Sequence, residues 1–216
     1  NDRVKTHAEP VPYLGGLGLL GGLGVGILMG IAICRTDGAF SDEWLWLLGV
    51  LAGGAVACSV GLADDLWDLR PWQKLLGQFL VAMVLLLMGI SPDVQCLVEL
   101  FGGSVSREIG TVLDALIVTG FVLGATNSLN LLDGLDGLCA GVTAIISVAL
   151  LLLGVHLATW GFSDAGDSVR IVLGLSLVGS LGGFLPFNRH PARIFMGDAG
   201  TMLLGSVIAA LMILFA

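Results

Sequence analysis

The sequence predicts an all-α protein that crosses a membrane about seven times, and three observations support this. Of its 216 residues, 56% are hydrophobic and only 12% are charged, whereas soluble domains carry roughly 25% charged residues. The apolar residues form long continuous runs and do not alternate with polar ones, which favours helices over a membrane barrel. The charged residues gather between these runs. We therefore expect a polytopic membrane protein with one transmembrane domain over residues 1–216.

Seven runs with little or no charge are the predicted membrane helices. They cover residues 14–34, 44–63, 75–90, 109–126, 138–162, 171–187 and 202–216. Crossing the hydrocarbon core takes about 20 helical residues, and the shorter runs suffice if they tilt little or end in the interface. The chain begins with Asn1, and its last run stops at Ala216 without a polar flank. We therefore expect both ends to be cut from a longer protein.

Local signals refine three of these elements. The first run carries glycines at nearly helical spacing, which predicts close packing on another helix: Gly15, Gly18, Gly22 and Gly26. Glycine is also simply common in membrane helices, which explains any single one of them about as well. Pro71 suits the first turn of the third helix. Residues 91–108 contain proline and glycine, and they fit a hairpin or an interfacial element equally well.

The polar segments alternate from one side of the membrane to the other. Two crossings separate each motif-bearing segment from the next, so four of them share one face: residues 1–13, 64–74, 126–137 and 187–200. They hold six of the nine cations: Arg3, Lys5, Arg70, Lys74, Arg189 and Arg193. Because positively charged loops stay in the cytoplasm, we expect this face to be cytoplasmic.

The first polar cluster is "GLADDLWDLRPWQKLLGQ", residues 61–78. Its acids, Asp64, Asp65 and Asp68, directly follow a run, and Lys74 brings a cation to the same segment. If the helix continues, Asp64 and Asp68 share a face, and neighbouring carboxylates shift each other's pKa. A solvated interfacial loop with loosely paired charges explains this cluster about as well as a functional site does.

The second cluster is "NSLNLLDGLDGLCAG", residues 127–141. Its polar residues recur at three-residue intervals: Asn127, Asn130, Asp133 and Asp136. On one continuous helix each step turns about 300°, so these side chains would form a slanted stripe. Helix capping explains one or two such residues but hardly four. The glycines at 134 and 137 weaken the helix and leave room for a ligand or another backbone.

The third cluster is "FNRHPARIFMGDAGT", residues 187–201. Asp198 lies between two glycines just before the last run, where it suits either a helix N-cap or a Mg²⁺ ligand. Arg189 and Arg193 are suited to phosphate, while His190 is more simply solvated. Phe195 suits either a membrane-interface anchor or a stacking partner for a base.

Together, the three clusters favour Mg²⁺-assisted phosphoryl transfer on a polyanionic substrate, because they place carboxylates, lysine and arginine on one face. The alternative is a secondary transporter whose acids relay protons or bind cations. A transporter predicts acids near the middle of the spans and an inverted repeat. Here the acids lie at span ends and the sequence has no convincing repeat, which disfavours the transporter.

The motifs also resemble those of a known family. "ADDLWDLRPWQKLLGQ", "NSLNLLDGLDGLCAG" and "NRHPARIFMGDAGTMLLG", in this order after "KTHAEPVPYLGGLG", are similar to the polyprenyl-phosphate N-acetylhexosamine-1-phosphate transferases of glycosyltransferase family 4. The third motif looks closest to the undecaprenyl-phosphate N-acetylglucosamine-1-phosphate branch. It is less like the muramoyl-pentapeptide branch.

The resemblance implies a reaction and a location. A polyprenyl phosphate oxygen attacks the β-phosphorus of a UDP-sugar, which gives polyprenyl-diphospho-sugar and UMP, with Mg²⁺ or alternatively Mn²⁺ as cofactor. This is the first membrane step of cell-envelope polysaccharide synthesis, such as lipopolysaccharide, on the cytoplasmic face of the bacterial inner membrane. The implied partners are a UDP-N-acetylhexosamine, undecaprenyl phosphate, the lipid bilayer and, as one option, a second copy of the chain. No nucleic-acid partner is expected.

The resemblance also implies residue roles. The implied metal ligands are Asp198 and, second to it, Asn130. The implied catalytic residues are the pair Asp64 and Asp65, one of which deprotonates or orients the lipid phosphate, together with Asp133. Lys74 is implied to contact the diphosphate, Asp136 to recognise uracil and Phe195 to stack near the base. The remaining implied substrate-binding residues are Asn127, Arg193 and Lys5, with His7 beside Lys5.

This sequence departs from the family pattern in two places. Thr201 stands where the family usually has serine, and it keeps a hydroxyl at the helix start. The family also continues into further spans and a histidine-rich HxHH-type loop that helps to bind the sugar nucleotide. Because the chain stops before that loop, we expect it to be an incomplete portion of the enzyme.

Overall fold

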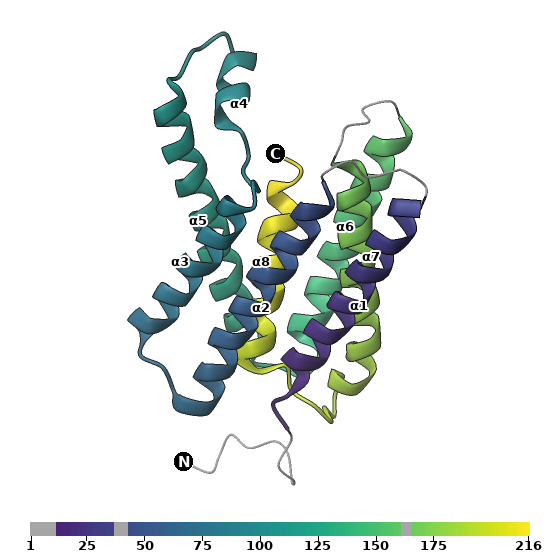
Figure 1. Ribbon diagram of the computed structural model, residues 1–216. Helices are drawn as coiled ribbons and strands as arrows, with labels where there is room; N and C mark the ends of the chain where they lie inside the picture. The colour runs from purple at the N-terminus through teal and green to yellow at the C-terminus, as the bar shows by residue number, and fades with distance from the viewer. Residues whose placement is uncertain (1–11, 37–42, 161–165) are drawn as a thin grey trace.

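The computed structural model describes residues 12–36, 43–160 and 166–216, which form eight helices (Figure 1). The first four are α1 (Gly15–Thr36), α2 (Trp44–Trp67), α3 (Pro71–Leu87) and α4 (Val94–Leu100). The last four are α5 (Arg107–Leu132), α6 (Leu138–Thr159), α7 (Asp167–Asn188) and α8 (Gly197–Ile213). The described residues contain no strand, so the all-α prediction is confirmed.

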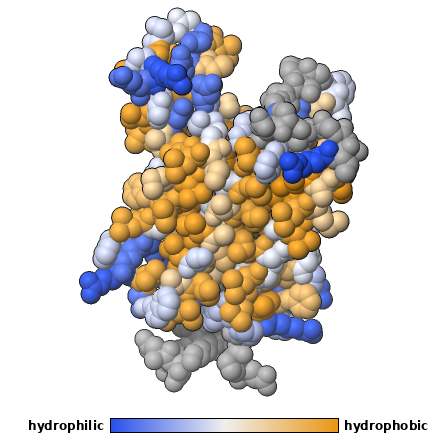
Figure 2. Space-filling model, in the orientation of Figure 1, coloured by the Kyte–Doolittle hydropathy of each residue, from blue (hydrophilic) through white to orange (hydrophobic). Residues whose placement is uncertain are grey.

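Seven of these helices coincide with the seven predicted apolar runs. Five of them, α1, α2, α5, α6 and α7, are long and apolar enough to cross a membrane, whereas α3 and α8 are apolar but shorter. Hydrophobic side chains cover the middle of the visible face, and hydrophilic ones lie toward both ends (Figure 2). The chain is therefore a multi-pass membrane protein.

The segment between α3 and α5 folds into the short helix α4 and not into a hairpin of strands. Two carboxylates satisfy N–H groups at the start of α4: Asp93 Oδ1 accepts from Cys96, and Asp114 Oδ1 of α5 accepts from Val94 at 2.9 Å. The first N–H groups of a helix lack partners within it. These bonds therefore attach α4 to α5 at the end of the bundle where the chain also ends (Figure 1).

Helix α8 forms the centre of the bundle, because small residues let its neighbours approach closely. Nearly all its side chains are buried, and it packs on α2, α5 and α1. A Cβ atom on Gly16 of α1 would lie 2.5 Å from the Gly200 nitrogen, and one on Gly205 would lie 2.5 Å from Thr126 Cα of α5. A Cβ atom on Gly61 of α2 would overlap the Asp198 carbonyl oxygen. Close approach of this kind is how helices associate in lipid.

Three of the four glycines pack closely on another helix as predicted, and that helix is α7. Added Cβ atoms would lie 2.9 Å from Ser180 Oγ at Gly22, 2.8 Å from Ser176 Cβ at Gly26, and 2.6 Å from a ring carbon of Phe184 at Gly15. Gly18 has no neighbour within 4 Å of an added Cβ, so its prediction is wrong. One helical step of three residues turns Gly18 about 60° away from Gly15.

The three acidic motifs meet at one end of the bundle, the lower end in Figure 1. There α2 ends and α3 begins, α5 ends and α6 begins, and α7 ends and α8 begins. The predicted sharing of one face is therefore confirmed for the three acidic motifs, while residues 1–11 of the fourth segment lie outside the described residues. The assignment of this face to the cytoplasm stays a prediction.

Candidate active site

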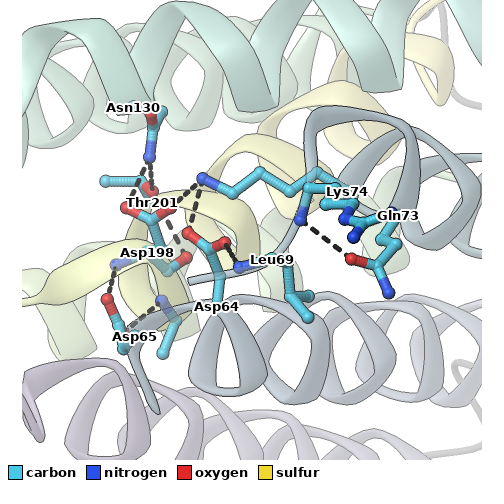
Figure 3. A network of polar contacts seen from close by, with 10 residues as sticks. Asp64, Asp65, Leu69, Gln73, Lys74, Asn130, Asp198 and Thr201 are labelled. Carbon is cyan, nitrogen blue, oxygen red and sulfur yellow. Dashed lines mark hydrogen bonds and ion pairs between the residues drawn. The ribbon is translucent and has the colours of Figure 1, made fainter. Parts of the chain in front are cut away.

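Four side chains from four helices meet at this end of the bundle (Figure 3). Lys74 Nζ of α3 lies 2.5 Å from Asp64 Oδ2 of α2 and 2.5 Å from Asp198 Oδ2 of α8. Asn130 Nδ2 of α5 donates to Asp198 Oδ1 at 2.7 Å. We call these four residues the Lys74 network. Each of the three sequence motifs contributes at least one member to it.

The turn between α2 and α3 orients Asp64 and Lys74 toward each other. Helix α2 ends at Trp67, and Asp68 adopts a left-handed conformation with φ 50°. The helix therefore does not continue through Asp68, and Asp64 and Asp68 do not share a helix face. Leu69 donates its N–H to Asp64 Oδ1 at 2.9 Å, which orients this carboxylate. Pro71 begins α3 as predicted, and Lys74 lies in the first turn of α3, facing α2.

Asp65 supports the start of α8. Its Oδ1 accepts the N–H of Asp198 at 2.9 Å, and its Oδ2 accepts the N–H of Ala199 at 3.1 Å. A negative charge at a helix N-terminus pairs with unbonded N–H groups and with the positive end of the helix dipole. The cap of α8 is therefore a side chain of α2. Asp198 is not the N-cap, a position held by Met196, so its own carboxylate is directed to Lys74 and Asn130.

The second motif does not continue as one helix, so the expected stripe is wrong. Helix α5 ends at Leu132 with Asp133 as its C-cap, and α6 begins after Gly137, whose φ is 75°. Glycine adopts such a conformation without strain, and this allows the chain to turn. Asp136 therefore lies in the turn between the helices and not on the face of α5.

The four polar residues of this motif consequently have different surroundings. Asn130 joins the Lys74 network, whereas Asn127 Nδ2 donates to Gln78 Oε1 at 3.2 Å and to the Leu123 carbonyl at 2.7 Å. Burial, followed by the negative charges of Asp198 and Asp65, raises the pKa of Asp133 to about 7. Asp133 therefore lies close enough to the network to respond to its charge.

Asp136 binds the loop between α7 and α8. Its Oδ2 accepts the Ala192 N–H at 3.1 Å and lies 2.9 Å from His190 Nδ1. His190, expected to be simply solvated, keeps an exposed ring but contacts this carboxylate. Within the same loop, Asn188 Nδ2 donates to the Ile194 carbonyl at 3.0 Å. The loop thus has a defined shape and is tied to the turn before α6.

Two other predicted substrate-binding residues, Arg193 and Phe195, lie in this loop. The N–H of Phe195 donates to the Pro12 carbonyl at 3.0 Å, and its ring centroid lies 5.3 Å from that of Tyr13. The N–H of Arg193 donates to the Phe187 carbonyl at 2.8 Å. Lys5 and His7 lie outside the described residues.

Two residues of the site received no role from the sequence. Thr201 Oγ1 of α8 accepts from Asn130 Nδ2 at 3.2 Å, so it helps to orient that amide. Gln78 of α3, one turn beyond Lys74, is buried and accepts from Asn127. The signal that would have found Gln78 is a single neutral polar residue inside an apolar run, because burying such a group needs a hydrogen-bond partner.

Asp198 and Asn130 are suited to a hard cation. Among residues 12–36, 43–160 and 166–216, no three His, Cys, Asp or Glu side chains are grouped as a metal site. Mg²⁺, however, is usually held by one or two carboxylates together with substrate phosphates and water. The Asp198 carboxylate provides one such ligand, and half a turn of the Asn130 amide would present its oxygen in place of Nδ2. These residues therefore fit the implied metal.

Comparison with known proteins identifies the family. The profile of glycosyl transferase family 4 matches residues 47–216, a range that contains all three acidic motifs. The chain belongs to this family. Membership confirms the resemblance drawn from the three motifs.

Curated family 4 proteins from two branches are similar to the chain. The decaprenyl-phosphate N-acetylglucosaminephosphotransferase of Mycobacterium leprae (strain TN) is 34% identical over 208 residues, 95% of this chain and 51% of that protein. The phospho-N-acetylmuramoyl-pentapeptide-transferase of Oceanobacillus iheyensis is 35% identical over 211 residues, 94% of this chain and 61% of that protein. The chain thus spans about half the length of the first relative. Since both branches match at similar identity, the preference for one sugar stays a prediction.

Hydrogen exchange can test whether the contact between Asp136 and His190 holds the α7–α8 loop in place. His190→Ala removes one of two contacts on Asp136 Oδ2. We expect amide hydrogen exchange in residues 188–196 to become about fivefold faster, the effect of losing one hydrogen bond. Mass spectrometry of the exchanged peptides measures it. His190→Asn is the matched control, because its Nδ2 takes the place of Nδ1, and an unchanged rate in His190→Ala would contradict this role.

Proposed function

We propose that the chain transfers an N-acetylhexosamine-1-phosphate, most simply N-acetylglucosamine-1-phosphate, from a UDP-sugar to undecaprenyl phosphate and releases UMP. The observation that carries this proposal is the meeting of Asp64, Lys74, Asn130 and Asp198 at one end of a membrane bundle. The relatives support it, because their names describe transfer of a phosphorylated sugar to a polyprenyl phosphate in one case and of phospho-N-acetylmuramoyl-pentapeptide in the other.

The charges of the site suit two phosphate-bearing substrates. Both substrates are anions, so the site needs cations where they meet. Lys74 supplies one positive charge from the protein. Asp198 and Asn130 would hold Mg²⁺, or alternatively Mn²⁺, which when bound offsets the charge that develops on the leaving phosphate.

The acidic residues have separate roles in the proposed transfer. In the proposed reaction a lipid phosphate oxygen forms a bond to the β-phosphorus, and the bond from that phosphorus to the bridging oxygen of UMP breaks. Asp64, whose Oδ2 faces the network, orients the lipid phosphate or takes its proton. Both oxygens of Asp65 bind N–H groups of α8, so we assign Asp65 to holding Asp198 in place. Asp133, with its raised pKa, completes the acidic set.

The nucleotide side of the proposed site is the loop between α7 and α8. Asp136, which joins this loop to the turn before α6, is proposed to recognise uracil, and Phe195 to stack near the base. Asn127, Arg193 and Lys5 are proposed to contact the remainder of the sugar nucleotide. We propose that this side faces the cytoplasm of a bacterial inner membrane and that the product enters cell-envelope polysaccharide synthesis.

An exchange reaction tests the proposed function. The purified full-length protein in detergent, given Mg²⁺ and undecaprenyl phosphate, is expected to incorporate labelled UMP into UDP-N-acetylglucosamine, because the transfer is reversible when both products are present. Thin-layer chromatography of the labelled nucleotide sugar measures the exchange. Omitting the lipid phosphate is the control and should abolish it. No exchange by folded protein with any UDP-N-acetylhexosamine would contradict the proposal.

A further inference from the structure

We infer that Lys74 acts as the counter-ion of the metal-binding carboxylates and thereby couples the binding of a divalent cation to the binding of a diphosphate. This inference rests on the proposed function. It assigns Lys74 two successive partners: the carboxylates of Asp64 and Asp198 in the free protein, and a substrate phosphate once the cation has bound.

The contacts of Asp198 are the first reason. One of its oxygens lies 2.5 Å from Lys74 Nζ, and the other accepts from Asn130 Nδ2 at 2.7 Å. Each oxygen therefore already contacts a hydrogen-bond donor. A cation that binds Asp198 must compete with these donors for the lone pairs of the carboxylate.

The two donors differ in how they can respond. Asn130 has an amide oxygen and becomes a ligand by rotation, as described above. An ammonium group has only donors, and its positive charge repels a nearby cation. Lys74 must therefore leave Asp198 when a divalent cation binds. Its flexible four-carbon stem allows this movement without a change in α3.

The surroundings of Lys74 explain why it needs another partner after leaving. Its side chain is 29% exposed, and its two carboxylate partners are 10% and 24% exposed. A partly buried charge that loses its partner is destabilised. A diphosphate arriving at the same end of the bundle offers lysine a strong anionic acceptor. Binding of the cation releases Lys74 from Asp198 to bind the diphosphate, and the diphosphate gives Lys74 a partner once it has left Asp198. Because such coupling is reciprocal, each ligand must tighten the binding of the other.

Mn²⁺ binding without nucleotide tests the first half of this inference. The free Mn²⁺ signal in electron paramagnetic resonance is titrated with wild type, Lys74→Met and Arg70→Met. Methionine keeps a stem of similar length but removes the charge. We expect Lys74→Met to bind Mn²⁺ about tenfold more tightly than wild type, a factor typical of coupled sites. Arg70→Met removes the same positive charge from an exposed residue directly before α3 and should bind as wild type does.

Binding of UDP-N-acetylglucosamine, measured by calorimetry with and without Mg²⁺, tests the second half. Mg²⁺ should tighten nucleotide-sugar binding in wild type and in Arg70→Met, and this effect should be several times smaller in Lys74→Met. Lys74→Gln should match Lys74→Met in both measurements and replaces it if Lys74→Met does not fold.

Equal or weaker Mn²⁺ binding in the folded Lys74 variants would overturn the inference, and wild-type UMP exchange would then still support the proposed function. Tighter Mn²⁺ binding in those variants without any UMP exchange by wild type would support the role of Lys74 as counter-ion and overturn the proposed reaction. Failure of wild type and of every folded variant to bind Mn²⁺ would overturn the inference, and UMP exchange would then decide the proposed function separately.

Discussion

Asp198→Asn is expected to lower UMP exchange by about a thousandfold or more, the scale of losing a charge-stabilising group at a reacting centre. Asparagine keeps the shape of the side chain but removes the charge that pairs with Lys74 and would bind the cation. The exchange of labelled UMP into UDP-N-acetylglucosamine measures the loss. Because the N–H of residue 198 still donates to Asp65, the start of α8 should be preserved.

Asp68→Asn is the matched control for this substitution. It removes the same negative charge at the same end of the bundle, from the first acidic cluster, at a residue in the left-handed conformation with φ 50°. Asparagine tolerates this conformation well, and Asp68 has no assigned role in the site. Its exchange should stay within about twofold of wild type, as for most surface substitutions. Retention of more than a tenth of wild-type exchange by Asp198→Asn would contradict the assignment of Asp198.

Gly61→Ala is expected to lower both stability and exchange, because its new methyl group would overlap the Asp198 carbonyl oxygen. Helix α2 would have to move away from the start of α8, and overpacking of this kind costs about 1–3 kcal/mol. The movement also separates Asp64 from Asp198, and a misplacement of about 1 Å can lower a rate about a hundredfold. Thermal unfolding in detergent and UMP exchange measure the two effects.

Gly18→Ala controls for the loss of a membrane glycine. It is also a helical glycine, but nothing lies within 4 Å of an added Cβ there. We expect wild-type stability and exchange from it. If Gly61→Ala behaves like Gly18→Ala, then the close contact of α2 with α8 does not determine the geometry of the site.

The contacts of α8 explain why these two substitutions should have the largest effects. Its first turn holds Asp198, donates two N–H groups to the Asp65 carboxylate, and lies against glycines of α1 and α2. A buried helix that contacts several neighbours has little freedom to move. The position of the Asp198 carboxylate is therefore set by the whole bundle as well as by its own loop.

Much of the fold follows from the sequence, because the requirements of a membrane are simple. A span needs a long apolar run with internally bonded backbone, and seven such runs became seven helices. Counting crossings then placed the three acidic motifs at one end, as the structure confirms. The motifs also led to family 4, since their residue types and order resemble a known pattern.

Individual contacts were harder to predict, because they depend on how helices end. The three-residue spacing of Asp133 and Asp136 fits one continuous helix, but α5 ends at Leu132 and the chain turns at Gly137. Asp64 and Asp68 diverge for the same reason, since α2 ends at Trp67. Helix ends are decided by capping groups from other segments and by single residues with unusual φ. Periodicity within one segment does not contain that information.

The amino-acid sequence is enough to predict the class of the protein, the number of apolar helices, the shared face of the acidic motifs and the family. It does not predict that Lys74 lies between Asp64 and Asp198, that Asp65 caps α8, or that Asp136 holds the α7–α8 loop, and these contacts emerge in the folded bundle. Transfer of a helix into lipid depends on its local composition, and this can be read from a single apolar run. Hydrogen bonds and ion pairs depend instead on distances of a few ångströms between segments that lie far apart in the chain.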